Sequence, residues 1–145
     1  MKKLVLLLSW FIISTSVSAQ NGTKLKGLET LAKQGDLAAQ IELANAYRKG
    51  IGVNQDYKTA VKWFTLAAEQ GDPLAQYNLG RLYYLGKGVP ESLVYAHMWA
   101  KHASLNGFEM GTELKVLLTE LMTENQINEA NKLGKECRIK KYKGC

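Results

Sequence analysis

Apolar residues recur along most of this chain every three or four positions, which is the spacing of an amphipathic α-helix. Ala39, Leu43 and Tyr47 give the clearest example, because they follow at i, i+4 and i+8 and therefore share one helix face. No segment alternates apolar and polar side chains as a half-buried strand does. The pattern predicts an all-α protein with about seven helices in antiparallel hairpins.

Residues that start and stop helices stand at the ends of these apolar stripes. Gly35 and Gly71 each end a predicted helix, and Asp36 and Asp72 are suitable N-caps for the helices that follow. The run Thr-Glu-Asn-Gln at 123–126 is a capping box ahead of a last helix. The chain is thus predicted to be a series of short helices joined by tight turns.

The same pattern returns after 36 residues. Residues 32–67 align with 68–103 without a gap, and 14 of the 36 positions are identical. A unit of this length cannot bury its own apolar face, so neighbouring units must stack into a solenoid. Residues 104–145 begin like a third copy and then diverge, which predicts a degenerate third unit and a C-terminal capping helix. We expect a single repeat domain over 20–145.

The repeated residues are expected to hold the fold rather than to carry function. The aromatic positions Tyr47, Tyr83, Trp63 and Trp99 are assigned to the core, because aromatic side chains at helical spacing bury large areas. Gly80 stands inside a predicted helix, where glycine is less stable than alanine by ~1 kcal/mol. That cost indicates a close approach between two helices at this point.

The identities between the two copies fall at fixed places in the unit. They include Gly35/Gly71, Asp36/Asp72, Ala39/Ala75, Gln40/Gln76, Leu43/Leu79, Tyr47/Tyr83, Gly50/Gly86, Gly52/Gly88, Val53/Val89, Ala60/Ala96 and Trp63/Trp99. This set resembles the Sel-1-like repeat, a relative of the tetratricopeptide repeat. The resemblance implies a right-handed α/α solenoid of helical hairpins. It also implies adaptor or scaffold work through protein–protein contacts, with no common ligand.

The first residues have the features of an export signal. Lys2 and Lys3 precede ten apolar residues, 4–13, and Val17-Ser18-Ala19 fits the small-residue cleavage pattern. We therefore predict a signal peptide over 1–19 and a mature protein that is periplasmic or secreted. A membrane-spanning helix needs ~20 apolar residues, so no membrane span is expected after cleavage.

The mature chain is moderately basic. Loss of Lys2 and Lys3 leaves 17 basic side chains against 13 acidic ones, a net charge of +4, and six of the 17 lie within 132–143. This end could contact an anionic envelope component or an acidic partner. It could also be a solvated end that complements the helix dipole, which is the interpretation that the sequence favours. No nucleic acid is expected, because no aromatic residues interleave a basic stripe.

Cys137 and Cys145 are the two cysteines of the chain. In an exported protein an even count favours a structural disulfide, for which loop entropy gives ~2.5 kcal/mol at this short separation. A zinc site is disfavoured, because the two thiols have no nearby histidine or third cysteine. The sequence predicts no metal and no cofactor.

The solenoid interpretation singles out the variable positions of each first helix as the surface that faces a partner. A protein or peptide suits them, because Arg and Tyr are frequent hot-spot residues; the alternative is that they are ordinary solvated positions. In the two full repeats they are Glu42, Asn45, Arg48, Asn78, Arg81 and Tyr84, and in the third unit Leu114, Leu117 and Glu120.

An enzyme is disfavoured. Some cysteine-rich secreted relatives with similar repeats have been linked to β-lactam binding or hydrolysis, but no serine here has a lysine three residues on. His97 and His102 are five apart, so they do not share a helix face as a metal pair would, and we expect them at the surface beside Trp99. The sequence thus favours a non-enzymatic adaptor. The alternatives are an envelope-ligand-binding protein or a self-assembling structural protein whose exposed ends stack.

Overall fold

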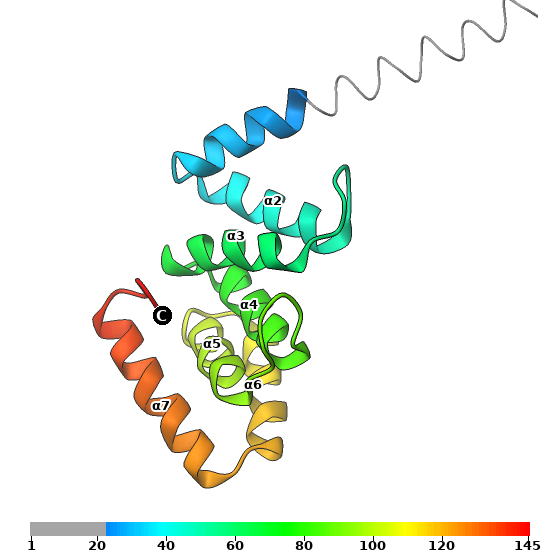
Figure 1. The fold of residues 1–145 in the computed structure, drawn as a ribbon. Coiled ribbons are helices and arrows are strands. Elements are labelled where there is room, and N and C mark those ends of the chain that lie inside the picture. The colour runs from blue at the N-terminus through cyan, green and yellow to red at the C-terminus, as the bar shows by residue number, and fades with distance from the viewer. Residues whose placement is uncertain (1–22) are drawn as a thin grey trace, which may run out of the picture.

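A computed structural model describes residues 23–145, so the predicted signal peptide lies outside the described residues. Within this range the chain forms seven helices and no strand, which confirms the predicted all-α solenoid of helical hairpins. The helices stack along one direction from the N-terminal end to the C-terminal end (Figure 1). They span residues 23–33, α2 (Leu37–Lys49), α3 (Tyr57–Glu69), α4 (Pro73–Leu85), α5 (Leu93–Leu105), α6 (Glu109–Leu121) and α7 (Glu124–Ile139).

The predicted caps begin the first helix of each repeat. Asp36 accepts a hydrogen bond from the main-chain N–H of Ala39 (2.8 Å), and Asp72 accepts one from that of Ala75 (2.7 Å). Both α2 and α4 end on a glycine in the left-handed region. The predicted capping box at the start of α7 is also present. Local sequence signals therefore set most helix boundaries.

Buried amides connect successive repeats and explain why Gln40 and Gln76 are identical. Gln40 donates from Nε2 to a main-chain carbonyl of the preceding helix (3.0 Å), while its Oε1 accepts from Gln70 (2.8 Å). The same arrangement recurs in the next unit, where Gln76 donates to a main-chain carbonyl (3.3 Å) and accepts from Asn106 (2.9 Å). A buried amide is costly when unpaired, so these bonds define how one repeat sits on the next.

Two glycines allow α5 to be approached closely from two sides. A Cβ on Gly80 of α4 would lie 3.0 Å from the carbonyl oxygen of Ala96, which agrees with the close approach predicted there. A Cβ on Gly111 of α6 would lie 2.7 Å from Cβ of Ala103. Helix α5 is therefore packed between α4 and α6, and its side chains form much of the core.

The last helix departs from the hairpin pattern of the two full repeats. Whereas α2 pairs with α3 and α4 with α5, α7 packs mainly on α5 and makes few contacts with α6. Figure 1 shows α7 lying along the side of the stack. Gly134 lies in this contact, where a Cβ would be at van der Waals distance from Met98 (3.5 Å) and His102 (3.6 Å). The C-terminal helix thus covers a face of α5.

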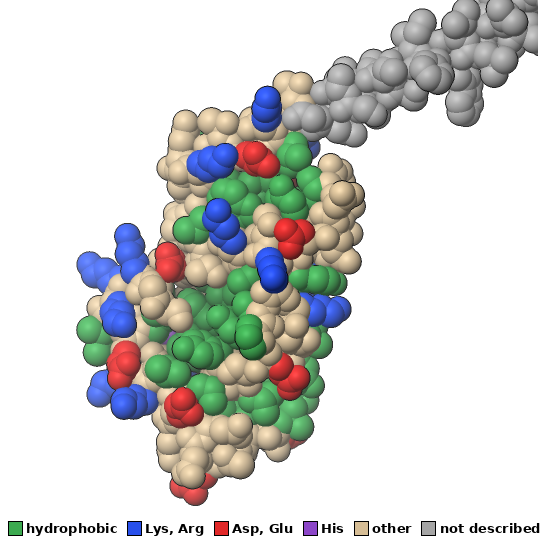
Figure 2. Space-filling model, in the orientation of Figure 1, with side chains coloured by type: hydrophobic (Ala, Val, Ile, Leu, Met, Phe, Trp, Pro, Cys, Tyr) green, Lys and Arg blue, Asp and Glu red, His purple; other side chains and the backbone are tan. Residues whose placement is uncertain are grey.

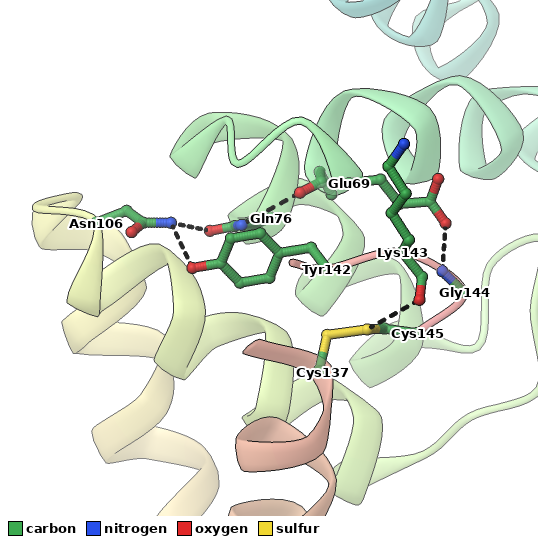
Figure 3. The surroundings of a disulfide bond; sticks show 9 residues. Glu69, Gln76, Asn106, Cys137, Tyr142, Lys143, Gly144 and Cys145 are labelled. Atoms are coloured by element: carbon green, nitrogen blue, oxygen red, sulfur yellow. Dashed lines mark hydrogen bonds between the residues drawn. A yellow bond between two sulfur atoms is a disulfide. The ribbon is translucent and has the colours of Figure 1, made fainter. Parts of the chain in front are cut away.

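Residues 140–145 fold back onto the repeats. Cys137 and Cys145 form the predicted disulfide, with their Cα atoms 5.6 Å apart. Tyr142 lies against the turn that follows α5, within reach of Asn106, and the main-chain N–H of Gly144 donates to Glu69 Oε1 (2.9 Å) (Figure 3). The disulfide therefore holds the tail against the loops of both full repeats.

Candidate functional site

Three adjoining grooves follow the first helices of the repeats. The first groove lies between the N-terminal helix and α2 and has a volume of about 540 Å³. Its polar lining includes Glu42, whose carboxylate pairs with Lys24 (3.6 Å), and Asn45. Its apolar lining is contributed by Leu25, Leu28 and Ile51.

The second groove is the smallest, about 80 Å³, and lies between α2 and α4. Three cations line it, Arg48, Arg81 and Lys87, and no acidic side chain does. Arg48 donates to Oδ1 of Asn45 (2.9 Å), which joins this groove to the first, while its buried Nε has no hydrogen-bond partner. The second groove is therefore the most electropositive part of this face.

The third groove, about 430 Å³, lies between α4 and α6 and shares Arg81 and Leu85 with the second. Its walls are largely apolar or aromatic. Arg81 lies over the ring of Tyr77, 5.7 Å from the ring centre, and Glu113 contributes the acid of the lining. The other lining residues are Tyr84, Met110, Leu114 and Leu117.

All six first-helix residues singled out from the sequence line this set of grooves, which we call the groove face. Their accessibility differs. Arg81 is exposed, whereas Asn78 is only 6% exposed and donates to the main chain of its own helix (2.9 Å). Asn78 therefore forms the floor of the second groove, whereas Arg81 and Tyr84 are more accessible to solvent.

Sequence reasoning missed part of the third groove. Tyr77, Leu85 and Met110 line it but were not singled out, and Leu114, which was, is only 7% exposed. The available signal was the apolar excess of the segment 109–122, which exceeds what one buried helix face requires.

The expected surface position of the two histidines is wrong. His97 is 4% exposed and His102 1% exposed, because α6 and α7 cover the faces of α5 on which they stand. His97 shares a hydrogen bond with Thr119 of α6 (3.2 Å), but neither ring nitrogen of His102 has a partner. His102 lies instead between the rings of Trp99 and Tyr142.

Burial, with the nearby charges of Arg138 and Lys101, lowers the pKa of His102 from 6.5 to about 4. The unfolded chain then binds a proton between these pH values that the folded protein does not, so stability must fall as the pH drops through this range. Between pH 7 and pH 5 we expect a loss of about 1 to 2 kcal/mol. Urea unfolding at the two pH values measures it, and His102→Leu should remove most of the loss. A His102 imidazole that titrates near 6.5 by NMR contradicts the prediction.

The part of the chain that the structure describes contains no group of three or more His, Cys, Asp or Glu side chains arranged to hold a metal ion. Among residues 23–145, no helix has the length and apolar character needed to cross a membrane.

The Sel1 repeat family model matches residues 37–72 and 73–108. These units have the same 36-residue period as the copies found in the sequence but begin at α2 and α4. No curated protein matches the chain.

Solved structures that are similar to the chain include the following two. One is a protective antigen present in uropathogenic Escherichia coli strains, displaying an SLR fold. It is 37% identical to this chain with a TM-score of 0.77, and the match covers 81% of this chain and 25% of that one. The other is a Sel1 repeat protein from Oxalobacter formigenes. It is 28% identical to this chain with a TM-score of 0.58, and the match covers 72% of this chain and 45% of that one. The chain thus spans less than half the length of either. The matched repeats and the shared fold together show that this chain is a member of the Sel1 repeat family.

Proposed function

We propose that this chain is a non-enzymatic adaptor that binds a protein or peptide partner along the groove face. Sel1 repeat proteins generally mediate protein–protein interaction, which supports an adaptor in outline. The observation that carries the proposal is the continuity of the three grooves along α2, α4 and α6. They combine exposed apolar surface with Arg and Tyr side chains, the composition of binding hot spots.

The lining of the grooves limits the chemistry of the partner. The second groove carries Arg48, Arg81 and Lys87 without an acid, so an acidic side chain of the partner fits there. The third groove is lined by Tyr84 and the exposed Leu117, so an apolar side chain of the partner fits there, next to the acidic one. The partner is therefore an extended segment with an acidic residue beside an apolar one.

We also propose that the adaptor works in the periplasm or after secretion. The residues ahead of the described range have the composition of a signal peptide, and the disulfide suits an oxidising compartment.

Photo-crosslinking in cells tests the adaptor proposal. A photoreactive amino acid replaces Asn45 or Arg81 on the groove face, and Lys58 on α3 serves as the control position. A protein crosslinked from Asn45 and Arg81 but not from Lys58 supports the proposal and identifies the partner. Self-crosslinks alone would support the self-assembling structural alternative instead.

Arg81→Glu is expected to abolish partner capture while leaving the thermal midpoint unchanged. The side chain is exposed and lines two of the grooves, so its reversal affects binding more than folding. Pull-down of the crosslinked partner measures capture, and Lys58→Glu is the matched charge reversal on α3. Full capture by a folded Arg81→Glu protein overturns the assignment of this face.

A further inference from the structure

The C-terminal end of the chain carries an unpaired basic surface that the groove face does not use. Figure 2 shows Lys and Arg side chains gathered over α7. The six basic side chains between residues 132 and 143 are all exposed, and none of them forms an ion pair in the part of the chain that the structure describes. Glu136 lies among them in the sequence, and the Glu69 carboxylate reaches the main chain of Gly144 beside Lys143. The surface, which we call the basic patch, comprises Lys132, Lys135, Arg138, Lys140, Lys141 and Lys143.

An apolar side chain stands in the middle of the basic patch. Ile139 is 73% exposed, more than any other large hydrophobic side chain that the structure describes as exposed. It lies four residues after Lys135 and three after Glu136, so these two side chains share its face of α7, and Arg138 and Lys140 adjoin it in the sequence. A solvated basic end, the interpretation that the sequence favours, gives this isoleucine no role.

The C-terminal end of the patch has an unusual backbone conformation. Lys141 and Tyr142 both have positive φ values, 53° and 66°, a conformation that side chains other than glycine rarely adopt. It is maintained because the disulfide closes the loop and the Tyr142 ring packs against His102, with ring centres 5.1 Å apart. The Tyr142 ring points toward Asn106 and Gln76 (Figure 3), and Lys141 and Lys143 on either side of it are exposed.

We propose that the basic patch docks this domain on an anionic phospholipid membrane. The cations contact lipid phosphates and Ile139 inserts among the headgroups, the arrangement of a peripheral membrane anchor. None of the three grooves includes a patch residue, so the surface suits an extended layer of charge better than a single peptide. Since α7 packs mainly on α5 while the grooves follow α2, α4 and α6, docking leaves the groove face free.

Co-sedimentation of the purified protein with lipid vesicles tests the proposal. We expect binding to vesicles of phosphatidylglycerol and phosphatidylcholine, little binding to phosphatidylcholine alone, and weakening by salt. The double variant Lys135→Gln/Lys140→Gln is expected to bind about tenfold more weakly or worse. Ile139→Ser is expected to bind about fivefold more weakly.

Two control variants remove lysines or an apolar side chain outside the basic patch. Lys33→Gln/Lys58→Gln removes two exposed lysines outside the patch, and Leu105→Ser removes an apolar side chain that is 55% exposed at the end of α5. Both should bind as the unaltered protein does, and circular dichroism should show every variant folded. Absence of binding to anionic vesicles, equal binding to neutral ones, or equal loss in the control variants overturns the proposal. Arg81→Glu should keep vesicle binding, so this test is independent of partner capture.

Discussion

Alanine at Gly88 is expected to lower the free energy of unfolding by about 3 kcal/mol, whereas alanine at Gly52 should lower it by about 1 kcal/mol. The two glycines occupy the same position of successive repeats and have similar φ values, 78° and 72°. A Cβ on Gly88 would collide with the main chain at Tyr57 and lie 2.8 Å from the nitrogen of Lys58, but a Cβ on Gly52 would meet nothing within 4 Å.

The comparison separates backbone strain from contact between repeats. Both substitutions force alanine into the left-handed region, and only the one at Gly88 also forces the loop of the second repeat away from α3. Urea denaturation of the two variants measures the difference. Equal losses at the two positions would mean that the loop relaxes freely, and that the contact with α3 does not stabilise the stack.

Replacement of Trp99 by alanine is expected to cost about 4 kcal/mol, the usual range for a buried tryptophan. Trp99 is 1% exposed and is the largest fully buried side chain that the structure describes. It packs where α4 and α5 approach closely, with its Cβ near Gly80, and its ring meets the edge of His102. The loss of this side chain would leave a cavity where the second repeat meets the C-terminal cap.

Two further variants on α5 serve as controls for this prediction. Leu105→Ala removes a side chain that is 55% exposed and should change the free energy of unfolding by less than about 0.5 kcal/mol. Trp99→Phe should recover part of the loss, because an aromatic ring still fills part of the space. A Trp99→Ala protein that unfolds at the same urea concentration as the unaltered protein would show that this junction does not limit stability.

Much of the groove face could be predicted from the 36-residue period. The period placed Glu42, Asn45 and Arg81 on the first helices, and all three line grooves. It could not distinguish Arg81, which is exposed, from Asn78, which is buried one turn earlier on the same helix. Accessibility depends on how near the next helix lies, and a period carries no information on that distance.

Features that depend on residues close together along the chain can be predicted from the amino-acid sequence alone. These are the helix caps at Asp36 and Asp72, the repeat period and the pairing of Cys137 with Cys145 over eight residues. Each follows from the residue types and their spacing: a side chain that bonds the next turn, a unit that must stack, and two cysteines that have no other cysteine to pair with.

The arrangement of the C-terminal third of the molecule depends instead on contacts between distant segments. There the repeat pattern fades, so nothing in the local sequence shows that α7 leaves α6 and covers α5. That packing buries His97 and His102. It also brings the ring of Tyr142 against His102, which lies 40 residues earlier in the chain. It also leaves Ile139 exposed among lysines. These outcomes depend on which distant surfaces meet, because the burial of a side chain is a property of its neighbours in space.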